Sequence, residues 1–207
     1  MAWSQWVPLA LICLLGAMSP GPSLAVVARY SVVQGTIAGL LCAVMHGMGV
    51  FLWALLMVSG LGAIIVNQPD WLNGIRATGA VFLLYLAGRA LTSGRDDASI
   101  SQPEITDGRL RAAWAGMAIA LLNPKIAVFF AALFSQFIRA DAELAERLVL
   151  AGTAAVIDAL WYALIAATLS RTRVLLPLQR HAVLLNRTFG VILVVLSLAV
   201  LRSVWQA

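Results

Sequence analysis

The chain has little charge, few histidines and only two cysteines, and each shortage excludes a class of protein. Charged residues make up 11% of its 207 residues, whereas a soluble globular domain carries about 25%. The sequence is therefore not that of an ordinary soluble protein. The two cysteines, Cys13 and Cys42, lie in separate apolar stretches and predict neither a disulfide framework nor a metal cluster. Accordingly, we expect no metal and no cofactor.

The sequence also lacks the features of nucleic-acid-binding proteins and of hydrolytic enzymes. The net charge of +5 comes from cations spread along the whole chain, and without a basic stripe a nucleic-acid partner is not expected. With only two histidines and no serine-nucleophile motif, the chain lacks the residue sets that hydrolytic enzymes use. We therefore do not expect an enzyme.

Long apolar segments are what the sequence has in abundance, since 62% of its residues are hydrophobic. Each of six such segments can cross about 30 Å of hydrocarbon as a helix. Because they are apolar on every face, they do not resemble the alternating strands of a membrane barrel. The sequence predicts an all-α polytopic membrane protein with six transmembrane helices, at residues 6–28, 37–66, 74–91, 112–138, 148–170 and 184–201.

Residues 92–111 are mostly polar and divide the chain into two parts of three spans each, 1–91 and 112–207. Two related parts with an odd number of spans must cross the membrane in opposite directions, as in inverted-repeat transporters. A short match supports a repeat, because residues 22–26 (PSLAV) resemble 124–128 (PKIAV) in the first span of the other half. We therefore expect two inverted three-helix repeats joined by a linker.

The arginines predict how the chain is oriented in the membrane. Connections after the first, third and fifth spans carry nine arginines, and the opposite side carries four. By the positive-inside rule the linker at 92–111 then faces the cytoplasm, and both termini are periplasmic. Tryptophans gather at membrane interfaces, and four of them fall at the predicted outer ends: Trp3, Trp6, Trp71 and Trp205.

Proline interrupts the first span near its middle. The break comprises Ser19, Pro20, Gly21, Pro22 and Ser23, and it begins roughly 20 Å into the segment at the rise of an α-helix. Two prolines flanking a glycine end a helix. The freed backbone groups must be satisfied by protein or by a water-filled cavity at that depth. A binding site is therefore predicted, with a kink packed against neighbouring helices as the alternative.

The fourth span has a second break, formed by Asn123, Pro124 and Lys125, at a similar depth. A lysine near the membrane centre costs about 2.5–3.5 kcal/mol or more. Lys125 is far from either end of the apolar segment, so we expect it to face a partner or a cavity rather than the membrane surface.

Asp158 is the only acidic residue inside a predicted span, and we expect it to pair with Lys125. Such a pair is able to open when substrate arrives, with Asp158 taking the substrate ammonium or a proton. The alternative is a permanent structural pair that joins the fourth and fifth spans. Tyr162 follows one helical turn later on the same face, either to contact a ligand or simply to pack. His46 is a further candidate, although a lone histidine on an apolar helix more often packs than titrates.

Glycines in and beside the second span predict close contacts between helices. They are Gly35, Gly39, Gly47, Gly49, Gly60 and Gly62.

These motifs together resemble the lysine exporter (LysE/RhtB) family of bacterial amino-acid efflux proteins. The resemblance rests on residues 19–22 (SPGP), 123–130 (NPKIAVFF), Gln136-Phe137, Asp158 and Phe189-Gly190. It implies an inner-membrane exporter of an amino acid or a close derivative, driven by an electrochemical gradient. We expect this to be a proton gradient, with protons exchanged for substrate. One departure lies in the second span, where the polar residue is His46 and Val50 follows Gly49.

A passive small-molecule channel or a lipid-handling membrane protein is the alternative, because broken helices also line pores. The expected partners are an amino-acid substrate, protons and the lipid bilayer. The glycine-rich spans are also compatible with a homodimer.

Overall fold

A computed structural model describes residues 3–19, 21–67, 69–92, 108–137, 142–169 and 175–205. In these ranges the regular elements are all helices, which confirms the all-α class. The helices are α1 (Trp3–Met18), α2 (Pro22–Val33), α3 (Thr36–Asn67), α4 (Pro69–Thr92), α5 (Arg109–Leu122), α6 (Pro124–Phe137), α7 (Leu144–Leu169) and α8 (Leu175–Trp205). Pro20 and most of the predicted linker, residues 93–107, lie outside the described residues.

Two pairs of consecutive helices are sharply bent against each other, at the two predicted breaks. The axes of α1 and α2 differ in direction by 63°, and those of α5 and α6 by 60°. Pro22 begins α2 and Pro124 begins α6. Proline suits the first position of a helix, where no intrahelical N–H bond is needed, but it cannot continue the preceding helix. The prediction that the first and fourth apolar segments are broken is confirmed.

Membrane-spanning length is met by two single helices in the described part of the chain, over Thr36–Gly60 of α3 and Leu144–Thr168 of α7. Counting each bent pair as one span raises the number to four. The third and sixth predicted spans fall on α4 and α8, whose apolar stretches, Ala77–Thr92 and Gly190–Arg202, are shorter.

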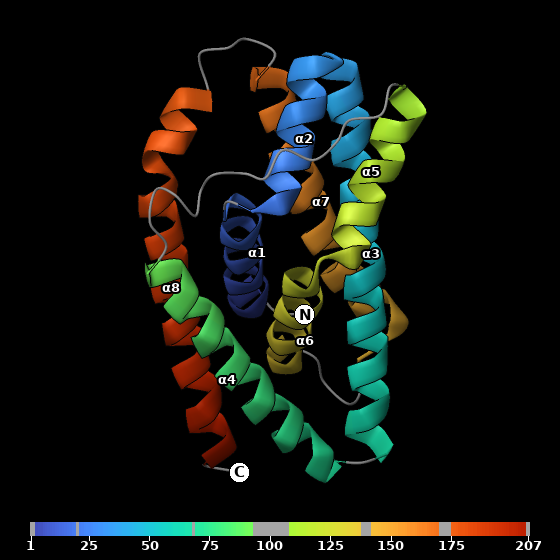
Figure 1. The fold of residues 1–207 in the computed structure, drawn as a ribbon. Coiled ribbons are helices and arrows are strands. Elements are labelled where there is room, and N and C mark those ends of the chain that lie inside the picture. Colours follow the sequence, from blue (N-terminus) through green and yellow to red (C-terminus); the bar gives the residue numbers. More distant parts are fainter. Residues whose placement is uncertain are drawn as a thin grey trace.

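Helix directions reverse between the two halves of the chain (Figure 1). In this view α1 and α2 run upward, α3 runs downward and α4 runs upward again. In the second half α5 and α6 run downward, α7 upward and α8 downward. Helix α3 packs along both α7 and α5, while α4 packs against α8.

Small residues let α3 approach its neighbours closely. A Cβ added to Gly47 would meet the Ala159 Cβ at 2.7 Å, and one added to Gly49 would meet the Ala120 Cβ at 2.6 Å. These contacts, with that of Gly39 against Ser31, confirm three of the predicted glycine contacts.

The prediction was wrong for two other glycines. Gly35 lies in the turn before α3 with φ +86°, a conformation that favours glycine. Gly60 has none of the described atoms within 4 Å of where a side chain would begin. The surroundings of Gly62 are outside the described side chains.

The outer faces of the long helices expose large apolar side chains, as expected of a surface in contact with lipid. Val44 on α3 is 55% exposed and Leu160 on α7 is 65% exposed. Further exposed side chains repeat along the same two helices: Leu41, Met48, Leu52, Leu56, Val149, Val156 and Leu164. The chain is a helical membrane protein.

Candidate functional site

A cavity lies where the two helix breaks meet, and α1, α2, α3, α6 and α7 all contribute to its wall. Its volume is about 50 Å³, which is room for a few water molecules. The predicted site residues that line it are Ser19, Gly21, Pro22, Ser23, His46, Asn123, Lys125, Asp158 and Tyr162. The side chain of Pro124 lies outside the described side chains. The fold thus brings together residues from both halves of the chain.

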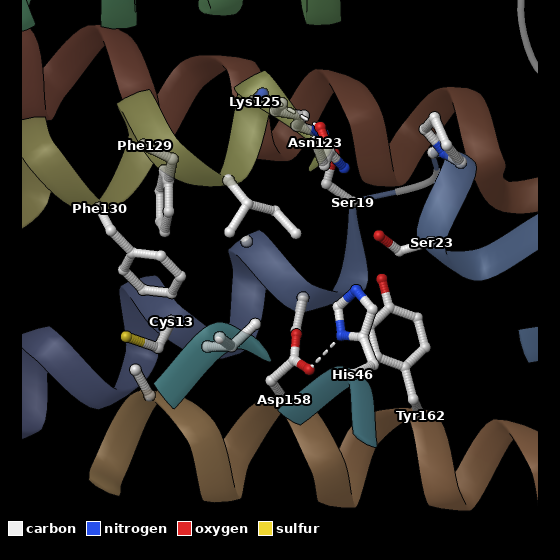
Figure 2. Close-up of a pocket in the computed structure, with 17 residues that line it drawn as sticks. Cys13, Ser19, Ser23, His46, Asn123, Lys125, Phe129, Phe130, Asp158 and Tyr162 are labelled. Carbon is white, nitrogen blue, oxygen red and sulfur yellow. Dashed lines mark hydrogen bonds and ion pairs between the residues drawn. The ribbon is translucent and has the colours of Figure 1, made fainter. Parts of the chain in front are cut away.

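The first turn of α2 presents its amino-terminal end to this cavity. Gly21 precedes the helix in an extended conformation, and no side chain caps the helix start. The first helical hydrogen bond runs from the Ala25 N–H to the Gly21 carbonyl, at 3.2 Å. The hydroxyl of Ser23 is buried and lies opposite the Tyr162 hydroxyl in Figure 2. A helix start without a side-chain cap, with a hydroxyl beside it, is suited to an anion.

The start of α6 is different because Asn123 caps it. Asn123 Oδ1 accepts a hydrogen bond from the backbone N–H of Lys125 at 3.0 Å. The Asn123 carbonyl accepts from Ile126 at 3.0 Å and from Ala127 at 3.3 Å. This helix start is already partly satisfied within the chain, so the two breaks are not equivalent in what they offer a ligand.

Lys125, the only lysine of the chain, joins the two breaks. Its Nζ donates a hydrogen bond to Ser19 Oγ, at 2.8 Å. Ser19 directly follows the last residue of α1, at the bend between α1 and α2, and it is 6% exposed. The ammonium group is therefore placed at the cavity rather than at a membrane surface.

Asp158 pairs with His46, so the predicted pair with Lys125 is wrong. The distance between Asp158 Oδ2 and His46 Nδ1 is 2.6 Å, and both residues are buried. Close packing of α3 on α7 is the physical reason, because Gly47 lies against Ala155 and Ala159 and brings His46 to the acid. Figure 2 shows Lys125 and Ser19 on one side of the cavity and the His46–Asp158 pair on the other.

The small residues around the pair were the signal that sequence reasoning missed. Gly47 follows His46 on α3, and Ala155 and Ala159 flank Asp158 on α7. Small residues on facing helices allow their backbones to approach. That pattern favours a contact between His46 and Asp158.

Tyr162 and the second ring nitrogen of His46 complete the polar side of the cavity. The Tyr162 and His46 rings meet edge to face, with centroids 4.8 Å apart. His46 Nε2 is buried, and within the described part of the chain it has no hydrogen-bonding partner. In Figure 2 this nitrogen points away from Asp158, toward the break between α1 and α2.

Apolar residues form the opposite end of the cavity, where Phe129 and Phe130 of α6 lie near Cys13 of α1 (Figure 2). The Phe129 and Phe130 rings pack edge to face, 5.2 Å between centroids. Gly16 is needed here because a Cβ would lie 3.0 Å from the Phe129 ring. The cavity therefore has an end for charged groups and an end for an apolar side chain.

This arrangement suits a small zwitterion with an apolar part. The start of α2 offers N–H groups to an anion, and the carboxylate of Asp158 offers a partner to a cation or a proton. Among the residues that the structure describes, no group of three histidine, cysteine or acidic side chains is close enough to hold a metal ion.

Comparison with known proteins identifies the family. The model of the LysE type translocator family matches residues 14–204. The chain is 29% identical to a leucine efflux protein of Klebsiella pneumoniae, over 60% of this chain and 58% of that protein. It is 25% identical to a threonine efflux protein of Salmonella typhi, over 84% of this chain and 85% of that protein. No solved structure matches the chain. The chain belongs to the LysE type translocator family, whose members are transporters and not enzymes.

Proposed function

We propose that this protein exports an amino acid, or a close derivative, across the bacterial inner membrane in exchange for protons. In this proposal the chain crosses the membrane six times as two inverted repeats of three spans, with both termini in the periplasm. The names of the relatives, leucine and threonine efflux proteins, support an amino-acid substrate. The reversed helix directions of the two halves, each beginning with a bent pair, support the inverted repeat.

The cavity at the two breaks is the observation that carries the proposal. It lies between the halves that would move against each other, and it is lined by a buried acid, Asp158, and by the partly buried Lys125. The substrate carboxylate would bind at the start of α2, near Ser23, because that helix end is uncapped and carries a partial positive charge. The ammonium group would bind on the side of Asp158.

Transport by the purified protein tests the proposal. The protein is reconstituted in liposomes that enclose radiolabelled L-leucine, L-threonine or another amino acid of a panel, and a proton gradient is imposed. We expect at least one amino acid to move against its own concentration gradient, and only with protons moving the other way. Movement that merely equalises the concentrations would favour a passive channel, and no movement of any amino acid would refute export.

The placement of the substrate is tested at Gly21, which lines the cavity. A Cβ added there would meet nothing closer than the Ser19 carbonyl oxygen at 4.0 Å, and the extended backbone accepts any residue. Gly21→Ala should therefore insert and retain most transport, whereas Gly21→Leu should insert and lose it because the larger side chain occupies the site. Unaltered export by Gly21→Leu would show that the substrate does not bind at this break.

A further inference from the structure

We propose that His46 Nε2 is the atom at which a proton and the substrate ammonium replace each other. The inference rests on the proposed export function and assigns its exchange step to one nitrogen. Neutral Nε2 would accept a hydrogen bond from the ammonium group. A proton arriving from the periplasm would bind to the same lone pair, break that hydrogen bond and release the amino acid.

The burial of Nε2 without a partner is the first observation behind this assignment. His46 is only 1% exposed, and the nitrogen has no hydrogen-bonding partner among the residues that the structure describes. Buried polar atoms are rarely left unpaired, so such an atom in a cavity indicates a missing ligand, water or proton. Figure 2 shows it pointing into the cavity rather than into the packed interface of α3 with α7.

The contact with Asp158 is the second observation, because it determines which ring nitrogen is available. An ionised carboxylate only accepts hydrogen bonds, so the proton of the neutral ring lies on Nδ1, 2.6 Å from Asp158 Oδ2. Nε2 then carries the lone pair. Asp158 acts here as a positioning residue that fixes the ring, while His46 itself contacts proton and substrate.

Charge balance explains why the two occupants would exclude each other. With substrate bound, the ammonium group compensates the charge of Asp158. With a proton on Nε2, the imidazolium compensates it instead. Each loaded state therefore keeps one positive charge on the His46 ring or next to it, whereas an empty, deprotonated site leaves the carboxylate only the Lys125 ammonium across the cavity, which is costly at this depth. An exchanger needs such an energetic penalty, because an empty site that changed sides freely would uncouple proton movement from substrate movement.

Other ionisable groups line the same cavity and enter its pH dependence. They are Asp158 and Tyr162 on α7, Lys125 on α6 and Cys13 on α1. Within the described lining, α2 contributes Pro22 and Ser23, which carry no charge. Histidine is the side-chain type that ordinarily changes charge between about pH 5 and 8. A pH dependence in that interval that disappears on substitution of His46 therefore belongs to His46.

The test uses His46→Gln, whose amide oxygen is able to accept from an ammonium group but not to bind a proton in this pH range. His181→Gln, which changes the other histidine of the chain, is the matched control. Both are reconstituted with the amino acid that the wild type carries, L-leucine or L-threonine first. We expect His46→Gln to exchange labelled for unlabelled amino acid but not to accumulate it with a proton gradient. The control should do both.

Substrate binding in detergent gives a second readout, and its wild-type measurement does not depend on the variant folding. In the wild type, a proton that competes with substrate weakens binding about tenfold per pH unit once His46 is mostly protonated. Adding the amino acid to weakly buffered solutions at steps between about pH 5.5 and 8 should therefore release protons in part of this range. In His46→Gln the affinity should not change between pH 5.5 and 8 by more than about a factor of two.

The outcomes separate this inference from the proposed function. Gradient-driven accumulation by His46→Gln at the wild-type level, or wild-type binding that releases no protons, would overturn the assignment while leaving export intact. If the wild type carries no amino acid at all, the proposed function fails and the assignment fails with it.

Discussion

At the residue scale, the protein holds the carboxylate of Asp158 and the imidazole of His46 together in an apolar interior. We therefore expect that removing either side chain alone lowers the stability of the protein. Removing one partner of a buried ionic pair typically destabilises a protein by about 3–5 kcal/mol, because the other group is left uncompensated. The 2.6 Å contact between Asp158 and His46 joins α7 to α3. Substitutions that keep shape but change charge therefore separate folding from function at this pair.

Asp158→Asn is the sharpest substitution of this kind. The amide keeps the size and a hydrogen bond to His46 but loses the charge that balances either ammonium or imidazolium. We expect the variant to insert, to exchange amino acid without a gradient and to fail to accumulate it against one. Flux into proteoliposomes with and without an imposed proton gradient measures both. Gradient-driven export at the wild-type rate would eliminate Asp158 as a residue needed for coupling.

The identity of the site residues could be predicted from sequence at this scale, but their pairing could not. Charged or proline-containing positions inside an apolar segment stand out locally, which is why Ser19, Lys125 and Asp158 could be named. Which of them meet depends on how two helices pack. The small residues at the contact of α3 with α7, rather than the charge of Lys125, determine that Asp158 pairs with His46.

At the scale of helices, α3 is the element that positions the site. Gly47 allows this because it has no side chain to keep α3 away from α7. A Cβ at Gly47 would lie 2.7 Å from the Ala159 Cβ and 3.0 Å from the Ala155 carbonyl oxygen. The close approach of α3 to α7 that this permits is the one that places His46 against Asp158.

Replacing two glycines of α3 by alanine should have opposite effects. Within a helix, Gly→Ala ordinarily stabilises by about 0.5–1 kcal/mol. Gly60→Ala, which meets nothing within 4 Å, should leave the melting temperature unchanged or raise it. Gly47→Ala should lower it by several degrees and reduce transport, because α3 is pushed away from α7. Equal melting temperatures for the two variants in the same detergent would contradict this packing.

The broken helices were predictable because proline acts locally, whereas helix partners were not. Pro22 and Pro124 fix where a second half-helix begins, whatever surrounds them. By contrast, Gly35 and Gly60 are glycines like Gly47, yet neither makes a close contact with another described helix. Gly35 forms a turn, and Gly60 has none of the described atoms within 4 Å of where a side chain would begin. Composition alone does not distinguish these environments.

At the scale of the whole molecule, the proposed topology places both termini outside and the segment around Ser99 in the cytoplasm. The excess of arginine after the odd-numbered spans is the physical reason, since positive charge is retained on the cytoplasmic side. Alkaline phosphatase is active only when exported. A fusion after Ser99 should therefore be inactive, and a fusion after Ala207 should be active. High activity of the Ser99 fusion would reverse or break the proposed arrangement of six spans.

An amino acid that occupies the cavity between the two helix breaks should protect Cys13 from alkylation. Cys13 lines the cavity, whereas Cys42, the only other cysteine of the chain, is packed in the interior away from it. In a Cys42→Ser variant, alkylation of Cys13 by a small thiol reagent is followed by mass spectrometry. A saturating concentration of the transported amino acid should slow the reaction at least several-fold, while an amino acid that is not transported should leave it unchanged. The same rate of Cys13 alkylation with and without the transported amino acid would contradict the account.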